Sequence, residues 1–255
     1  MTSSFISLYT ITRREVTRFL RIWPQTLLPS AITQSLYFLI FGGFIGSQIA
    51  SINNVSYMEF IIPGLVMMAV ITNSYMNTSS SFYISKFQRN IEEMLVSSTP
   101  NWAIITGFVL GGVLRGLLVG LVVFAVSFMF VSPHIFNIAI ILLFAVLTST
   151  VFSLAGLVNA VFAKKFDHIN IVPTFVLTPL TYLGGVFYSI KNLPEFWQRV
   201  SQFNPIVYMV DGFRYGFYGF SDMNVFVSAL VLIIIATFLS GLSLFFMNKG
   251  IGLRS

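Results

Sequence analysis

The sequence contains no cysteine and few charged residues. Without cysteine among its 255 residues, both a disulfide framework and a thiolate metal site are excluded. Charged residues make up 9% of the chain, whereas a soluble globular domain carries roughly 25%. Hydrophobic residues make up 56%, and the mean hydropathy is +0.87. A soluble fold of this size could not hide so much apolar surface in one core, so the composition predicts an integral membrane protein.

Signatures of enzymes and of energy coupling are also missing. The two histidines, His134 and His168, fall in different loops, so we expect no metal site. The chain contains no Gly-Lys pair, which the phosphate loop of nucleotide-binding proteins requires. Its carboxylates fall at span ends, in loops or in the N-terminal helix, whereas ion-driven carriers usually keep carboxylates inside the bilayer. If the protein transports actively, the ATPase must be another polypeptide.

Residues 1–24 predict an amphipathic helix. Because the charges follow the apolar residues, we do not expect a cleavable signal peptide. Such a helix suits the membrane surface, and packing on the protein's own cytoplasmic face is the alternative. The apolar residues share one face at helical spacing, with the arginines mostly off it: Phe5, Leu8, Tyr9, Val16, Phe19, Leu20 and Trp23, against Arg13, Arg14, Arg18 and Arg21.

Residues 25–255 predict an all-α, polytopic transmembrane domain with six membrane-spanning helices. Each apolar run is close to the roughly 20 residues that a span needs. We expect the spans at 25–46, 58–80, 103–131, 136–162, 169–188 and 225–247. Between the last two spans lies an aromatic but more polar region, 189–224, which Pro194 and Pro205 divide into short pieces. This outer re-entrant region is expected to dip into the membrane interface without crossing.

The basic residues predict the orientation. Most fall on the side of the two termini, which the positive-inside rule assigns to the cytoplasm. Topology therefore explains the net charge of +6, and no nucleic acid partner is expected. The expected cytoplasmic set is Arg13, Arg14, Arg18, Arg21, Lys86, Arg89, Lys164, Lys165, Lys249 and Arg254, and the outer set is Lys191, Arg199 and Arg214.

Polar residues inside the spans are candidates for a pathway or for helix packing. The inner half of the second span contains Asn73, Tyr75 and Asn77, which must face other helices or a wet cavity because lipid cannot satisfy their hydrogen bonds. Thr178 and Tyr182 are the corresponding candidates in the fifth span.

The third span combines a glycine stripe with an arginine. Gly112, Gly116 and Gly120 recur every fourth residue, which predicts a groove for close helix packing. Arg115 lies beside this groove, and a central Arg costs about 2.5–3.5 kcal/mol on translocon scales. It is therefore expected to be paired, to face a wet cavity, or to lie less deep than its position indicates.

The loop 85–100 predicts a short amphipathic cytoplasmic helix. Ser85 and Gln88 have the spacing of a capping box at its start. It is either a solvated surface helix or a docking element for the missing ATPase. Its apolar residues are Phe87, Ile91, Met94 and Leu95, and its charged residues, expected to be exposed, are Lys86, Arg89, Glu92 and Glu93.

At these positions the chain resembles the permeases of ABC-2 type transporters over nearly its whole length. The loop Ile91–Leu95 followed by Pro100 is similar to the family's coupling-helix region, although many relatives have Gly at Asn90. Residues 172–190 and the ending GLRS are most similar to inner-membrane transport permeases within that family. The most specific similarity lies around the fifth span and the re-entrant region, at Pro179, Gly184, Gly185, Leu193, Pro194, Asn204, Pro205, Tyr208 and Arg214.

The resemblance implies a homodimer bound to two cytoplasmic ABC ATPase subunits. The ATPases would bind ATP and Mg, and this chain would bind no cofactor and be no enzyme itself. It would export an amphiphile, such as a lipid, a drug or a glycoconjugate, across the cell inner membrane. The alternatives are an ion-gradient-driven secondary transporter and an intramembrane enzyme.

Overall fold

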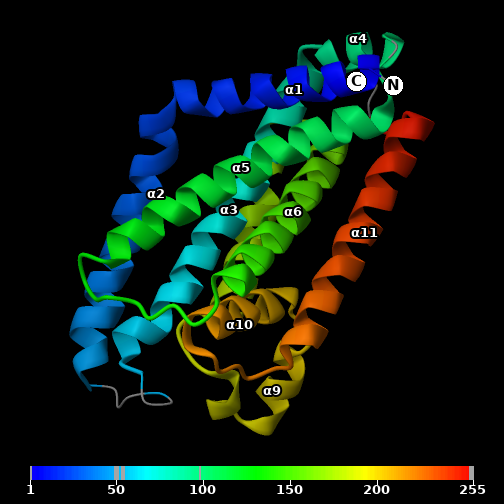
Figure 1. Cartoon of the computed structure of the whole chain (residues 1–255). Coiled ribbons are helices and arrows are strands. Elements are labelled where there is room, and N and C mark those ends of the chain that lie inside the picture. The colour runs from blue at the N-terminus through cyan, green and yellow to red at the C-terminus, as the bar shows by residue number, and fades with distance from the viewer. Residues whose placement is uncertain (1, 49–51, 53–54, 98, 253–255) are drawn as a thin grey trace.

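The computed structural model describes residues 2–48, 52, 55–97 and 99–252, and this part of the chain is all-helical apart from its turns and loops (Figure 1). An isolated antiparallel bridge joins Ile52 and Val55. The all-α prediction is confirmed.

The α-helices are α1 (Thr2–Arg21), α2 (Trp23–Tyr37), α3 (Tyr57–Phe87), α4 (Asn90–Val96), α5 (Asn101–Ser127), α6 (Ile138–Phe162), α7 (Asp167–Val172), α8 (Thr178–Tyr182), α9 (Glu195–Ser201), α10 (Pro205–Tyr218) and α11 (Val225–Lys249). Four further segments are π- or 3-10-helical among the described residues: η1 (Phe38–Ile45), η2 (Gly46–Gln48), η3 (Pro173–Leu177) and η4 (Ile190–Asn192).

Among the described residues, five helices are long and apolar enough to cross a membrane. They are Trp23–Ile45, which joins α2 to η1, and α3, α5, α6 and α11. They match the first, second, third, fourth and sixth predicted spans, although α3 continues seven residues beyond the expected end at 80. α3 is the central helix, with α5 and α6 packed against it, whereas α2 and α11 lie at the flanks (Figure 1).

The predicted fifth span, 169–188, is shorter and less regular than expected. α7, η3 and α8 follow one another without a gap and end at Tyr182. Pro173 has no N–H to donate, and the helix is π-helical from this residue to Leu177. The segment 167–182 measures about 24 Å, which is less than the roughly 30 Å hydrocarbon layer. The described chain therefore has five helices of spanning length where the sequence predicted six.

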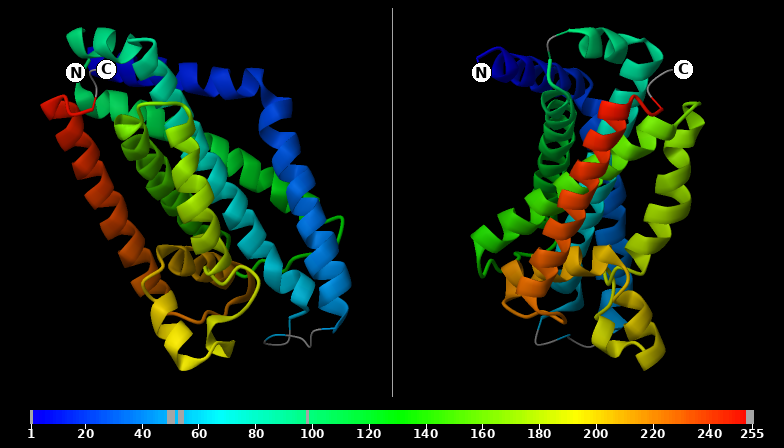
Figure 2. Two further views of the ribbon diagram at one scale, coloured as in Figure 1. Left: turned by 180° about the vertical axis from the view of Figure 1, so that it is seen from behind. Right: turned by 90° about the vertical axis from the view of Figure 1, so that its right-hand side faces the viewer.

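Both ends of the described chain lie at the same end of the bundle as α1 and α4 (Figures 1 and 2). α1 runs across that end, and α9 and α10 lie at the opposite end. The segment 167–182 runs lengthwise along the bundle toward α9 and α10 (Figure 2).

Lys86, expected to be exposed, instead ties the elements at the α1 end together. Its Nζ donates hydrogen bonds to the carbonyl oxygens of Ala160 (3.0 Å), Val161 (2.8 Å), Ala163 (2.8 Å) and Gly252 (3.2 Å). The last carbonyls of a helix have no partner within it, and a cation there also complements the helix dipole. Lys86 of α3 thus caps the C-terminus of α6.

The predicted glycine groove of α5 is confirmed as a packing surface for α3. A Cβ at Gly112 would lie 3.0 Å from the carbonyl oxygen of Ser74, and a Cβ at Gly116 would lie 3.2 Å from that of Val70. Larger residues would push against backbone, which cannot move aside as a flexible side chain can. The close approach lets α3 bury its polar face against α5.

Candidate functional site

Glu15 is a buried carboxylate where α1 crosses α3 and α5. Its side chain is 1% exposed, and a Cβ at Gly111 of α5 would lie 2.5 Å from the Cβ of Glu15. One carboxylate oxygen accepts hydrogen bonds from Ser81 Oγ (2.6 Å) and Arg18 Nη2 (3.1 Å), and the other lies 3.4 Å from Arg14 Nη2. A buried carboxylate needs such partners.

Glu15 was not predicted as a site residue. Placed between Arg14 and Arg18 on an amphipathic helix, it has the pattern of an ordinary surface ion pair. The face of α1 that packs on the protein contains Ile11, Glu15 and Phe19, whereas Phe5 and Tyr9 of the predicted apolar stripe are exposed. One face of α1 therefore packs on the protein, and the residues of the other face are exposed. The glycines at 107 and 111, one turn apart on α5, were the signal that another helix approaches closely there.

Arg18 and Arg115 meet at the side-chain oxygen of Asn77. Arg18 Nη2 donates to Asn77 Oδ1 at 2.8 Å, and Arg115 Nη1 donates to the same oxygen at 3.4 Å. Asn77 is fully buried, and Arg115 is half-buried. One amide thus joins arginines from α1 and α5 on the central helix. Among the described residues, the Nδ2 of Asn77 and the Nε of Arg115 are buried without a hydrogen-bond partner.

The other pathway or packing candidates divide into two groups. Asn73 and Tyr75 are buried within the chain, and Asn73 Nδ2 donates to Ser30 Oγ at 3.1 Å. Thr178 and Tyr182 are exposed on the surface of the single chain, where the hydroxyls of Tyr182 and Tyr37 lie 2.8 Å apart. The structure does not bring the two groups together into one site.

The α3–α4 junction differs from the predicted loop. Ser85 and Gln88 do not form a capping box, because α3 continues to Phe87 and buries Ser85. The chain turns at Arg89, whose φ of 61° is in the left-handed region. A non-glycine residue there is strained by about 1 kcal/mol. A two-residue turn, Gln88 and the strained Arg89, therefore joins α4 to the central helix.

The apolar residues of the predicted docking element have different roles. Ile91 is fully buried in the protein's own core, and Met94 and Leu95 pack partly against the same cluster. Ile91 was predicted as a docking contact; it instead holds α4 onto the bundle, because its side chain has no surface left for a partner. Phe87 is 75% exposed, Glu93 is exposed and Glu92 is half-buried. Val96, which was not predicted as a docking contact, is 89% exposed.

At the opposite end, Arg214 joins α10 to the loop after α8. It was expected among the outer basic residues, and its side chain is buried. Its Nη2 donates to the carbonyl oxygen of Gly185 at 2.6 Å, and its guanidinium stacks 4.0 Å from the ring centroid of Phe60. Burial lowers the pKa of Arg214, and the nearby Asp211 opposes that shift. Gly185 has a φ of 73°, a conformation that favours glycine.

Asp211 anchors the chain that leads into α11. Its carboxylate accepts hydrogen bonds from the backbone N–H groups of Asp222 and Met223, both at 2.8 Å. Burial raises the pKa of Asp211, and the two backbone hydrogen bonds together with Arg214 oppose the rise. Asp222 in turn accepts from Ser189 Oγ at 2.6 Å. The hydrogen bonds of Asp211, Arg214 and Asp222 therefore join α10 to the loops before α9 and α11, which indicates a structural role for this polar cluster.

The remaining signature residues shape the same junction. Pro194 precedes α9, and Pro205 is the first residue of α10, where the missing N–H costs nothing. A Cβ at Gly184 would lie 2.6 Å from Cγ2 of Ile206, so α10 packs closely on the turn after α8. Pro179 is exposed on α8. Region 189–224 thus contains the short helices η4, α9 and α10.

The chain is similar to a family of membrane transport proteins. The family model described as ABC-2 type transporter matches residues 6–218. The chain is 55% identical over 253 residues to the "Inner membrane transport permease YadH" of Escherichia coli strain K12, covering 98% of both chains. It is 22% identical to "Nodulation protein J" of Neorhizobium galegae over 95% of this chain and 94% of that one. "Nodulation protein J" of Rhizobium leguminosarum bv. viciae is 23% identical over 80% of each.

Proposed function

We propose that this chain, which belongs to the ABC-2 type transporter family, is the membrane subunit of an exporter driven by a separate ATPase. The protein is an inner membrane transport permease with several apolar helices. The observation that carries the proposal is the family match over residues 6–218 together with a sequence that has no phosphate loop. ATP and Mg would then bind to the partner ATPase.

The proposal includes a sixth crossing of the membrane by residues 167–182. The lengthwise course of this segment supports it, as does the position of both described chain ends at one end of the bundle (Figure 2). A short helix is accommodated by local thinning of the bilayer at modest cost. The concentration of Lys and Arg at the α1 end favours that end as cytoplasmic.

The ATPase would bind the exposed surface of α4 together with Phe87, the last residue of α3. Phe87 and Val96 offer apolar contacts, and Glu93 offers a charge at their rim. In protein interfaces, buried apolar contacts supply most of the affinity and rim charges supply specificity. Because only Gln88 and Arg89 separate α4 from the buried central helix, movement of a docked ATPase would be passed directly to α3.

The pathway would form between two copies of the chain. Thr178 and Tyr182 are polar, exposed and on a segment of membrane depth, a position that lipid would not favour. In a homodimer they would face the second copy or the transported amphiphile. The surrounding exposed surface is mainly apolar, which supports a lipid, a drug or a glycoconjugate as the exported class.

The test is copurification of the ATPase with tagged permease from native membranes. Val96→Asp and the double substitution of Glu92 and Glu93 by Lys should each reduce the ATPase recovered, by about tenfold for Val96→Asp. Lys165→Gln, also expected on the cytoplasmic face, is the control and should leave recovery unchanged. Equal recovery from all variants would place the ATPase contact elsewhere.

A further inference from the structure

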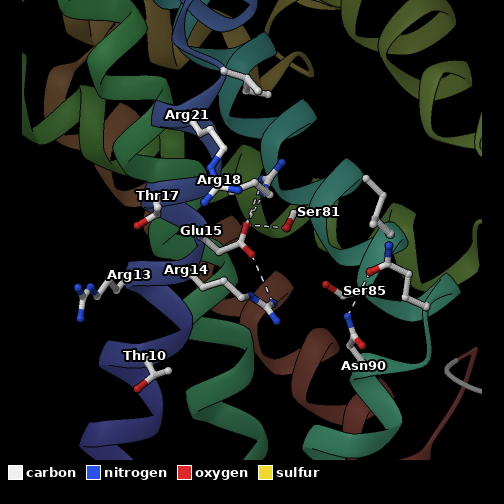
Figure 3. Close-up of a pocket in the computed structure, with 13 residues that line it drawn as sticks. Thr10, Arg13, Arg14, Glu15, Thr17, Arg18, Arg21, Ser81, Ser85 and Asn90 are labelled. Atoms are coloured by element: carbon white, nitrogen blue, oxygen red, sulfur yellow. Dashed lines mark hydrogen bonds and ion pairs between the residues drawn. The ribbon is translucent and has the colours of Figure 1, made fainter.

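A pocket of about 660 Å³ lies between α1, the end of α3 and the start of α4 (Figure 3). Its volume falls in the range of small-molecule sites. Arg14, Arg18 and Arg21 are spaced by four and three residues, so one face of α1 presents all three to this pocket. Nothing in the proposed coupling mechanism uses this cavity.

The pocket has an excess of positive charge. Besides the three arginines, Arg13 lies at its edge, and Glu15 is the carboxylate among the lining residues. Glu15 is already shared by Arg14 and Arg18. Among the described residues, Arg21 forms no side-chain hydrogen bond or ion pair, and it is exposed. Like charges at this spacing on one helix repel each other, and a bound anion would relieve the repulsion.

Two of the arginines are held in place before any ligand arrives. Arg18 donates both to Glu15 and to the buried Asn77, at 3.1 and 2.8 Å. Arg14 contacts Glu15 and stacks over the ring of Phe108, 5.4 Å from its centroid. Planar guanidinium groups bind phosphate oxygens in pairs, and fixing them beforehand lowers the entropy cost of binding.

Apolar residues on the rim distinguish a membrane amphiphile from a soluble anion. Ile22 and Ile84 both line the pocket, and each is 39% exposed. Trp23, which follows Ile22 in the chain, begins the first apolar span and is also exposed. An acyl chain could follow this surface into the bilayer while a charged headgroup stays among the arginines.

We propose that this pocket binds the phosphate-bearing headgroup of an anionic amphiphile from the cytoplasmic leaflet. This proposal rests on the proposed function in one respect, since that function places the α1 end, and with it the pocket, on the cytoplasmic side of the membrane. A lipid headgroup and a free organic phosphate would both bind through their phosphate group. The apolar rim of the pocket favours the lipid. An acidic surface of the ATPase is the competing occupant, which the experiment below separates.

The test is binding of fluorescent short-chain phosphatidic acid to the purified full-length chain in neutral detergent, without ATPase. Unlabelled dihexanoyl phosphatidic acid should displace the probe. Dihexanoyl phosphatidylcholine should need about tenfold more, because its choline group cancels the charge, and glycerol 3-phosphate should not displace the probe at the same concentration. Equal displacement by glycerol 3-phosphate, or by phosphatidylcholine, would overturn the proposal.

Matched variants locate the site. Arg14→Gln with Arg21→Gln should weaken probe binding by at least about tenfold. The control, Lys164→Gln with Lys165→Gln, removes the same charge from another loop and should change binding less than about twofold. Arg21→Gln alone breaks no contact seen in the structure and should still weaken binding several-fold, which keeps the test valid if the double variant folds poorly.

The outcomes separate this inference from the proposed function. Equal probe binding by the arginine variants and the control would refute the lipid pocket. Loss of ATPase copurification from the arginine variants with unchanged probe binding would assign the arginines to the ATPase and also refute it. Normal probe binding by a chain that never copurifies with an ATPase would refute the proposed function and leave the lipid pocket standing.

Discussion

Removing the carboxylate of Glu15 should loosen α1 from the bundle. Ser81 is buried, and its 2.6 Å hydrogen bond to the carboxylate is lost when Glu15 is changed to Ala. A hydrogen bond to a charged group contributes about 1.5–3 kcal/mol. The side chains of Arg14 and Arg18 are 42% and 31% exposed, so they can rehydrate, and their ion pairs contribute about 0–1 kcal/mol each.

Because desolvation of the carboxylate offsets part of these gains, we expect Glu15→Ala to cost about 2–3 kcal/mol. Glu15→Gln keeps an acceptor for Ser81 and should cost about 1 kcal/mol. At roughly 2–4 °C for each kcal/mol, Glu15→Ala should lower the melting temperature in detergent by about 5–10 °C. Thermal unfolding followed by size-exclusion chromatography measures this directly.

The control is Glu93→Ala, which removes an exposed carboxylate and should change stability by less than about 0.5 kcal/mol. Combining Glu15→Ala with Ser81→Ala should cost about 1–2 kcal/mol less than the sum of the single changes, because both remove the same bond. If Glu15→Ala melts within error of Glu93→Ala, the buried network does not stabilise the protein and the reasoning fails.

Three further predictions concern topology, the outer cluster and the α4 turn. In intact cells, Ser132→Cys should react with an impermeant thiol reagent and Gln88→Cys should not; the reverse would invert the proposed orientation. Arg214→Gln should lower the free energy of unfolding by about 2–4 kcal/mol, because it breaks the hydrogen bond to Gly185 and leaves that carbonyl buried without a partner. The control Arg199→Gln removes one partner of an exposed ion pair and should lower the free energy of unfolding by under about 1 kcal/mol. Arg89→Gly should raise stability by up to about 1 kcal/mol by relieving the left-handed residue, and a destabilising effect would show that the turn is unstrained.

The long spans were predictable from the sequence because a bilayer demands about 20 consecutive apolar residues. Five of the six expected segments appear at spanning length, with ends that differ by up to seven residues. The predicted fifth span, 169–188, differs because a hydropathy average takes no account of Pro173, which changes the local hydrogen-bond pattern, or of Gly185, which turns the chain. The length of an apolar segment predicts that it lies within the membrane. It does not predict that the segment forms one continuous helix.

The candidate sites were harder to predict because they depend on which faces meet. Glu15, Lys86 and Arg214 all have the pattern of exposed charges, and each is used inside the protein by a partner distant in sequence. Ile91 follows an amphipathic pattern, but periodicity cannot tell whether an apolar face meets the protein's own core or a partner. The glycine spacing of α5 was informative because close approach needs small residues whatever helix approaches.

The central claim, that this chain is the membrane subunit of an ATP-driven exporter, is tested most directly by its energy source. The measurement is outward transport of a fluorescent amphiphile in proteoliposomes, with the permease alone and with its copurified ATPase. The account predicts transport only when the ATPase and Mg-ATP are both present, and no response of the permease alone to an imposed proton or sodium gradient. Gradient-driven transport by the permease alone, without ATP, would contradict it and establish a secondary transporter.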